Sequence, residues 1–164
     1  MKIAVAMSGG VDSSVAAAIL QKQGYEIVGA TMRHFANTAY GFAPNEGIDQ
    51  AIDDAKAVCE KLQIEHFVID VSAEFQKIIE QNFIDEYRHG RTPNPCALCN
   101  PTIKWGIFLN KIHALGYDKI ATGHYVKLVE KNGVFQLHNA SDSAKDQSYY
   151  LWRLQQFQLA KTLF

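Results

Sequence analysis

The feature that most constrains the fold of this chain lies at its start. An apolar run at residues 2–7 leads directly into the motif S-G-G-V-D-S-S at residues 8–14, and an amphipathic segment follows to about residue 23. A short buried strand, then glycines, then hydroxyls that open a helix is a pattern typical of a phosphate cradle. Glycines allow a tight turn that brings backbone N–H groups close to an anion. We expect Ser13 and Ser14 to cap the helix.

The loop differs from two familiar phosphate loops. A Walker loop, G-x-x-x-x-G-K-[ST], carries a lysine that reaches the outer phosphates, and a dinucleotide loop reads G-x-G-x-x-G. Residues 8–14 fit neither pattern and contain no lysine. The alternative is a glycine-rich turn without a ligand, but the agreement of seven consecutive residues with their position after a strand favours phosphate binding. The motif resembles the PP-loop of the N-type ATP pyrophosphatases, which use ATP to adenylate a carbonyl or amide oxygen and release pyrophosphate.

Length and composition indicate one ordinary globular domain. The chain has 164 residues, 48% hydrophobic residues and a formal net charge of −1, which suits a single packed core. No stretch of about 18 apolar residues is present, so we expect no membrane span. The apolar start leads straight into the glycine loop, so we expect no signal peptide and a cytoplasmic protein. The charge balance gives no sign of nucleic-acid binding by itself, and any RNA contact must come from local patches.

Predicted strands alternate with predicted helices. Strands are expected at residues 2–7, 26–32, 66–71 and 119–122, helices at about 13–23, 48–62, 73–88 and 102–115, a hairpin at 125–130 and 134–138, a long functional or mobile loop at 33–47, and a helical tail at 146–164. This order predicts a Rossmann-like α/β fold, a mostly parallel sheet flanked by helices. Ligands in such sheets bind beyond the carboxyl ends of the strands. We therefore expect Ser8, Met32, Gly123 and His124 to lie at one edge.

A second motif presents two thiols. Residues 90–100 read G-R-T-P-N-P-C-A-L-C-N, and their two prolines oppose regular structure. We expect a stiff loop that holds Cys96 and Cys99 just before a helix N-terminus, where the helix dipole lowers the pKa of a thiol. Arg91 and Lys104 would lower it further. The C-x-x-C spacing also suits metal binding or redox chemistry.

Four separated motifs together resemble one family. They are the PP-loop, P-N-P-C-A-L-C-N at 93–100, A-T-G-H-Y at 121–125 and K-D-Q-S-Y at 145–149. Their order and spacing are similar to those of the tRNA-specific 2-thiouridylases, the MnmA/TrmU family, whose catalytic domain has the Rossmann-like fold of the adenine nucleotide alpha hydrolases. The resemblance implies conversion of the wobble uridine, U34, to 2-thiouridine. ATP adenylates the C2 oxygen, a cysteine persulfide delivers sulfur, and AMP and pyrophosphate are released.

The resemblance also implies roles for individual residues. Those that would bind ATP are Ala6, Met7, Ser8, Gly9, Gly10, Val11, Asp12, Ser13, Met32 and Gly123. Those that would meet the flipped target base or other parts of the tRNA are Asn94, Pro95, Cys96, His124, Lys145, Asp146 and Gln147. Cys99 would be the catalytic nucleophile, with Cys96 as a possible second catalytic thiol. The implied cofactors are ATP and Mg²⁺, and the implied partners are tRNA and a sulfur-carrier or cysteine desulfurase relay.

The chain departs from the family pattern in two ways. Cys96 stands where many members carry an aspartate proposed to activate the catalytic cysteine. It could be a second sulfur-handling thiol, or Cys96 and Cys99 could ligate zinc or an iron–sulfur cluster with an outside ligand, since two ligands do not complete such a site. The family's persulfide cysteine, in a central domain followed by a β-barrel domain, would lie beyond position 164. We therefore expect residues 1–164 to be the N-terminal PP-loop domain alone, a separate piece of a longer protein or a split gene product.

Other interpretations remain open from the sequence. A PP-loop amidotransferase or ligase using ammonia would need the PP-loop but not the two thiols, and a non-catalytic nucleotide- or RNA-binding module would need no sulfur donor. Cys59 is expected to be buried in a helix. Residues 88–91, R-H-G-R, fit an RNA-facing patch and plain solvation equally well. We expect four residues at helical spacing to pack in the core: Phe75, Ile79, Phe83 and Tyr87.

Overall fold

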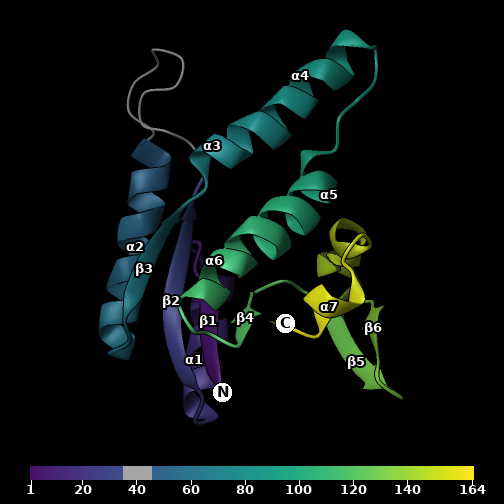
Figure 1. Ribbon diagram of the computed structural model, residues 1–164. Coiled ribbons are helices and arrows are strands. Elements are labelled where there is room, and N and C mark those ends of the chain that lie inside the picture. Colours follow the sequence, from purple (N-terminus) through teal and green to yellow (C-terminus); the bar gives the residue numbers. More distant parts are fainter. Residues whose placement is uncertain (35–45) are drawn as a thin grey trace.

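The computed structural model describes residues 1–34 and 46–164, so most of the long loop expected at 33–47 lies outside the described residues. The fold is built on a five-stranded parallel sheet in the order β3-β2-β1-β4-β7 (Figure 1). Its strands are β1 (Lys2–Ala6), β2 (Glu26–Arg33), β3 (His66–Asp70), β4 (Lys119–Ala121) and β7 (Thr162–Leu163). The predicted Rossmann-like α/β fold is confirmed.

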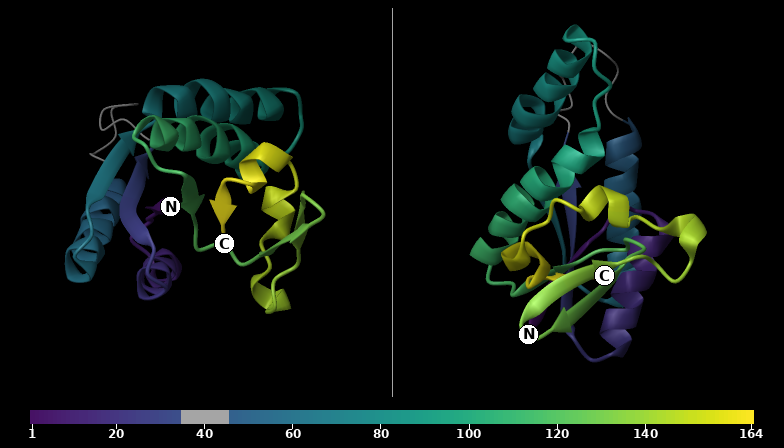
Figure 2. Two further views of the ribbon diagram at one scale, coloured as in Figure 1. Left: turned by 60° about the horizontal axis from the view of Figure 1, so that its bottom comes forward. Right: turned by 90° about the vertical axis from the view of Figure 1, so that its right-hand side faces the viewer.

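Helices cover both faces of the sheet (Figure 2, left). One face carries α1 (Val11–Lys22) and α2 (Glu46–Leu62). The other carries two long helices, each with a π-helical stretch: α3 (Ser72–Phe75), Gln76–Glu80 and α4 (Gln81–Arg88), then α5 (Pro95–Cys99), Asn100–Phe108 and α6 (Leu109–Ala114). This is the arrangement expected when right-handed crossovers run first to one side of β1 and then to the other.

Side chains of β1 alternate between two cores. Ile3 and Val5 face α1 and α2, where they pack with Ala17 and Cys59. Ala4 faces the opposite layer, whose core includes the fully buried Trp105, Phe108 and Ile112. The strand is buried on both faces, which explains why residues 2–7 read as a continuous apolar run. The prediction that Cys59 is buried is confirmed.

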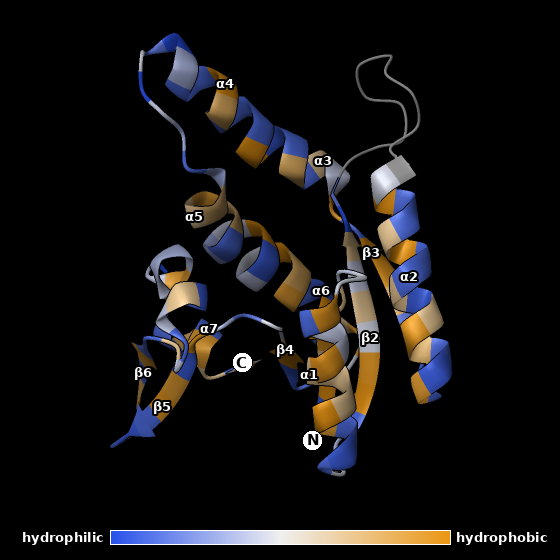
Figure 3. Cartoon of the chain, turned by 180° about the vertical axis from the view of Figure 1, so that it is seen from behind, coloured by the Kyte–Doolittle hydropathy of each residue, from blue (hydrophilic) through white to orange (hydrophobic). Residues whose placement is uncertain are grey.

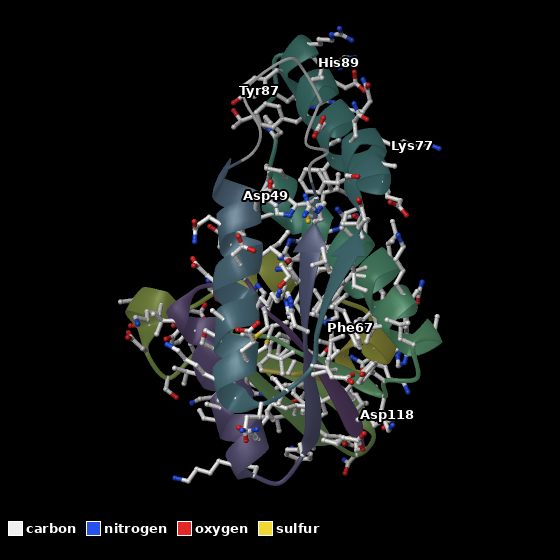
Figure 4. All side chains as sticks on the ribbon, turned by 90° about the vertical axis from the view of Figure 1, so that its left-hand side faces the viewer. Asp49, Phe67, Lys77, Tyr87, His89 and Asp118 are labelled. Atoms are coloured by element: carbon white, nitrogen blue, oxygen red, sulfur yellow. The ribbon has the colours of Figure 1, made fainter. Side chains whose placement is uncertain are left out.

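The outer half of the α3–α4 helix is not core, contrary to our expectation. Ile79 is buried, but Phe83 and Tyr87 expose 43% and 56% of their surface. The reason is that α4 extends beyond the sheet (Figure 1). Tyr87 and His89 lie at its far end, well away from Phe67 of strand β3 (Figure 4). The helical spacing correctly identified an apolar stripe on this helix, but it could not show that the sheet ends before the outer part of the stripe.

The predicted helical tail at 146–164 is wrong. The segment forms short 3₁₀ turns at Ser143–Lys145 and Ser148–Leu151, a single turn α7 (Gln156–Leu159), and β7. Asp142 caps the turn that precedes the tail by accepting from Ala144 N. Asp146 explains the break at the tail's start, because it accepts from Ala140 N and Ser148 Oγ with a non-helical backbone. Leu163 therefore ends a sheet strand beside Ala121 rather than a helix.

The predicted hairpin is confirmed as β5 (Lys127–Lys131) and β6 (Val134–His138), with Asn132 and Gly133 both at positive φ in the turn. Within residues 1–34 and 46–164, no helix has the length and apolar character that crossing a membrane requires.

Candidate functional site

The site lies where the strand order changes direction. The chain runs from β1 through β2 to β3 on one side, and β4 and β7 lie on the other. The carboxyl ends of β1 and β4 therefore open a crevice, the usual ligand position in such a sheet. A cavity of about 350 Å³ is found there. Its lining residues are Ala6, Met7, Ser8, Asp12, Ser13, Ala30, Met32, His34, Lys104, Thr122, Gly123, His124 and Gln147. The expected meeting of the PP-loop, Met32, Gly123 and His124 at one edge is confirmed.

Two glycines permit this meeting. Gly9 has φ +76°, and a Cβ there would lie 2.6 Å from the Ala51 carbonyl oxygen of α2. Gly123 lies against the first turn of α1, where a Cβ would lie 2.7 Å from the carbonyl carbon of Asp12 and 2.8 Å from Ser13 N. Any side chain at either position would push the loop away from its neighbour. The glycines therefore hold the loop, α2 and the end of β4 together.

The PP-loop is ordered by its own hydroxyls. Ser13 is buried, its Oγ accepts from Ser8 N at 3.2 Å, and it donates to Gly10 O at 3.1 Å. Ser14 Oγ donates to the same carbonyl at 2.8 Å. The expectation that Ser13 and Ser14 cap the helix is wrong: α1 begins earlier, with Gly10 as its N-cap and no side-chain cap. The first-turn N–H groups, which have no acceptor within the helix, are available to an anion.

His124 and Lys104 form the opposite wall. Lys104 Nζ lies 3.4 Å from His124 Nε2, and His124 Nδ1 lies 2.8 Å from Thr122 Oγ1. Because an ammonium only donates, Nε2 accepts from Lys104 and Nδ1–H donates to Thr122. Burial, and secondarily the Lys104 charge, lower the pKa of His124 to about 3. The imidazole is therefore neutral, and the positive charge here belongs to Lys104.

The two thiols lie on a helix rather than in a loop before one. The helix begins at Pro95, with Asn94 as its N-cap: Asn94 Oδ1 accepts from Ala97 N at 3.1 Å. Proline is compatible with the first helical position because that N–H needs no partner. Our expectation of irregular structure thus holds only as far as Asn94. Cys96 is exposed, and Cys99 is partly buried.

The predicted lowering of the Cys99 pKa is also wrong. Burial raises the pKa of Cys99 above its ordinary value, and the nearby Lys104 opposes this only in part. Arg91 does not assist, because its guanidinium is paired with Glu86 at 2.6 and 2.8 Å in an exposed position. The free thiol is therefore held mainly in its protonated form until something changes its surroundings.

The two thiols do not make a metal site by themselves. Among residues 1–34 and 46–164, no group of three or more His, Cys, Asp or Glu side chains is placed to hold a metal ion. Cys96 and Cys99 would supply two of the usual four ligands. The described residues thus do not fit a resident zinc ion or iron–sulfur cluster.

The segment 145–147 is tied to the PP-loop through Tyr125. Tyr125 N donates to Gln147 Oε1, and Gln147 N donates to Tyr125 O. Tyr125 OH donates to Asp12 Oδ1 at 2.8 Å, and Lys145 Nζ lies over the tyrosine ring, 4.8 Å from its centroid. Asp146, where the helical tail was expected to begin, instead holds a turn through its bond from Ser148 Oγ. Nine predicted site residues do not line the crevice. They are Gly9, Gly10, Val11, Asn94, Pro95, Cys96, Cys99, Lys145 and Asp146.

Five residues at the site were not predicted as binding residues: Ala30, His34, Lys104 and Thr122, which line the cavity, and Tyr125, which donates to Asp12. A signal for Lys104 existed, since a charged residue between the apolar Ile103 and Trp105 is unusual in a buried helix. Tyr125 and Thr122 flank Gly123-His124, but nothing in the sequence showed that the tyrosine would reach Asp12.

The fold and the crevice define a class: a Rossmann-like domain in which a PP-loop and a neighbouring lysine line one cavity beyond the carboxyl ends of β1 and β4. The chain matches the family described as "tRNA methyl transferase HUP domain" over residues 1–164, and it belongs to that family.

Curated relatives sharpen this. A protein of Methylobacillus flagellatus named tRNA-specific 2-thiouridylase MnmA is 50% identical over 164 residues, covering 99% of this chain and 45% of the relative. One of Geotalea uraniireducens with the same name is 44% identical, again over 99% of this chain and 45% of the relative. The predicted resemblance to the thiouridylases is confirmed. The chain spans less than half the length of these relatives.

Solved structures support the fold. A predicted tRNA methyltransferase subunit from Methanocaldococcus jannaschii superposes with a TM-score of 0.55 at 21% identity, covering 99% of this chain and 66% of that one. The U34-tRNA thiolase NcsA of Methanococcus maripaludis, determined with its [4Fe-4S] cluster, gives 0.51 at 22% identity over 76% of this chain and 38% of that one. At these identities the likeness concerns the fold.

Proposed function

We propose that these 164 residues form the ATP-using half of a tRNA-specific 2-thiouridylase. The PP-loop binds the phosphates of ATP, the C2 oxygen of a wobble uridine attacks the α-phosphate, and pyrophosphate leaves. The outer sulfur of a cysteine persulfide then attacks C2, and AMP leaves with the original oxygen. The Cys99 thiolate attacks the inner sulfur of the persulfide, so the S–S bond breaks, 2-thiouridine is released and a disulfide remains, which a thiol reductant reduces before the next turnover. The names of the relatives at 44–50% identity support this reaction.

One observation carries the proposal: three separate motifs converge on the β1–β4 crevice. The PP-loop forms one wall, Gly123 and His124 form another, and Gln147 closes the side next to them. A Rossmann-like domain needs only the first for nucleotide binding. The other two would place the tRNA and the nucleotide at the same spot, as adenylation of a base requires.

Individual roles follow for the thiols. Cys99 acts as the nucleophile in sulfur transfer, and the substrate complex must lower its pKa, since the free thiol is mainly protonated. Cys96, exposed one helical turn earlier, would assist on the side of the incoming base with Asn94 and Pro95. We do not extend the cluster of the thiolase NcsA to this chain, because the described residues offer too few ligands.

The remaining components belong to the same proposal. Mg²⁺ would enter with ATP, and among the described residues Asp12 supplies the carboxylate that lines the crevice. Lys145, Asp146 and Gln147 would contact the tRNA. The persulfide and the rest of the tRNA surface would come from the family's central and β-barrel domains, with a sulfur-carrier or cysteine desulfurase relay, in the cytoplasm.

Pyrophosphate release tests the first half of the reaction. The 164-residue chain is mixed with Mg·ATP and a tRNA transcript with U34, and with a transcript in which U34 is replaced by C34. We expect pyrophosphate release that depends on U34. If the chain binds ATP but neither transcript changes the release of pyrophosphate, a nucleotide-binding module is the better interpretation.

The second half of the reaction is tested together with the part of a relative that this chain does not cover. Residues 1–164 can replace the matching part of the Methylobacillus flagellatus relative, and 2-thiouridine in tRNA is then measured by mass spectrometry. We expect the variant Cys99→Ser to abolish thiolation without changing ATP affinity. Cys96→Asp, which restores the residue of many family members, should retain it. Full thiolation by the Cys99→Ser protein would exclude the proposed nucleophile.

A further inference from the structure

The PP-loop contains no lysine, but the side chain of Lys104, from another part of the chain, lines the same crevice. We propose that its ammonium group contacts a phosphate of the bound nucleotide and so takes the place of the lysine that a Walker loop carries within its own sequence. The inference rests on the proposed use of ATP and names a further binding residue for it.

The position of Lys104 supports this role. It belongs to the π-helical segment Asn100–Phe108, between the fully buried Ile103 and Trp105, so its stem is fixed by the core. Its Nζ lies 3.4 Å from His124 Nε2 and 5.6 Å from the centroid of the Trp105 ring. The side chain lines the same cavity as Met7, Ser8 and Ser13. A π-helical turn often marks a functional position, and here it carries the amine toward the PP-loop.

The charges around the cavity favour an anion. None of the ion pairs formed by the described residues includes Lys104. Among residues 1–34 and 46–164, the one carboxylate found to line the cavity belongs to Asp12, which already accepts from Tyr125. His124 is neutral, and the first turn of α1 adds the partial positive charge of a helix N-terminus. Lys104 therefore faces a space whose described groups favour an anion.

Burial agrees with an anionic ligand. Burial lowers the pKa of Lys104 from its ordinary value, because removal from water disfavours the charged ammonium form. A polyphosphate beside it would favour the charged form again. Ligand binding would therefore fix both the charge and the position of the amine.

The thiol of Cys99 is the competing partner. The Lys104 charge does act on Cys99, yet the pKa of that thiol remains raised. Cys99 also does not line the cavity into which Lys104 projects, whereas Ser8 and Ser13 do. Phosphate is therefore the partner that the geometry favours.

Nucleotide titrations separate these roles. ATP, AMP and adenosine are titrated into the 164-residue chain and into its Lys104→Met and Lys104→Arg variants, by calorimetry for the nucleotides and by ligand-observed NMR for adenosine. We expect Lys104→Met to weaken ATP and AMP binding by about tenfold or more, as for loss of a charge-assisted hydrogen bond, with adenosine binding unchanged. Lys104→Arg should retain most of the ATP affinity. Lys111→Met is the control, because Lys111 lies on the same long helix and pairs with Glu74 on the surface.

Each outcome decides the inference. Retained adenosine binding shows that the variant site is folded, and Lys104→Gln provides a second neutral variant if Lys104→Met does not fold. Equal ATP affinity in wild type and variants overturns the inference while the proposed use of ATP stands. If Lys104→Met changes the pH dependence of Cys99 alkylation but not the affinity for ATP or AMP, the amine acts on the thiol, and the inference is overturned. If the wild-type chain binds no ATP, the proposed function fails as well.

Discussion

The thiol of Cys99 is under two opposing influences, and their balance can be measured. Burial raises its pKa, and the Lys104 charge lowers it. Removing that charge should raise the pKa further, so less thiolate is present at a given pH. We expect alkylation of Cys99 by iodoacetamide, followed between about pH 7 and pH 10, to shift to higher pH in Lys104→Met. Lys111→Met should leave the profile in place, and an unshifted profile in Lys104→Met would show that the amine and the thiol do not interact.

Gly123 allows a second residue-scale prediction, because it approaches the α1 backbone so closely. A methyl group at this position would meet backbone atoms of Asp12 and Ser13 at 2.7–2.9 Å. Backbone cannot give way as a flexible side chain can, so Gly123→Ala should cost about 1–3 kcal/mol of unfolding free energy. Urea denaturation measures this. Gly47→Ala is the control, since a Cβ there meets nothing within 4 Å; equal stability of both variants would contradict the close approach.

Sequence reasoning succeeded for residues whose chemistry is local. The glycines and serines of the PP-loop predict a tight turn between a strand and a helix, so the position of the loop at the sheet edge was predictable. The position of the Lys104 side chain at the crevice was not predictable. It depends on the π-helical segment Asn100–Phe108, which shifts side chains relative to ordinary helical spacing. The prediction of a lowered Cys99 pKa was wrong for a related reason. Burial depends on the tertiary structure, and here it outweighs the effect of the nearby charged residues.

At the scale of elements, Tyr125 joins two segments more than a hundred residues apart. Its hydroxyl binds Asp12 at the start of α1, and its backbone holds Gln147. A double-mutant cycle with Asp12→Asn and Tyr125→Phe should give a coupling of about 1 kcal/mol in unfolding free energy, as for an exposed hydrogen bond to a charged group. The same cycle with Tyr149→Phe, an exposed tyrosine nearby, should give none. Zero coupling in both cycles would mean that the link does not persist in solution.

The elements themselves were predictable where each has a marked beginning and end. Strands β1 to β4 are apolar runs between glycines or polar turns, and α1, along which hydrophobic residues predominate (Figure 3), ends before Gly24. The tail defeated the same reasoning. Its polar residues suit a helix by propensity, but Asp146, where the tail was expected to begin, accepts from Ala140 N and Ser148 Oγ and has an extended backbone that ends the turn begun by Asp142. Propensity was overridden by local capping.

For the molecule as a whole, alternation predicted a parallel sheet but not its strand order. That order decides where the site lies, because only a reversal between β1 and β4 opens the crevice. The order also places β7, a strand of only two residues, beside the helix that carries Lys104. β7 lies beside β4, and its side chains lock the helix that carries Lys104 onto the sheet.

This lock rests on Thr162. Its buried hydroxyl accepts from Trp105 Nε1 at 2.6 Å and donates to Gln158 O at 2.7 Å. Thr162→Val keeps the shape but leaves a buried indole N–H and a carbonyl without this partner, which should lower the unfolding free energy by about 1–3 kcal/mol. Thr162→Ser keeps the hydroxyl and should lose clearly less. Because Trp105 adjoins Lys104, we also expect Thr162→Val to weaken ATP binding more than adenosine binding. Equal stability of the valine and serine variants in urea denaturation would show that packing alone, and not the hydrogen bond, holds β7 to the helix.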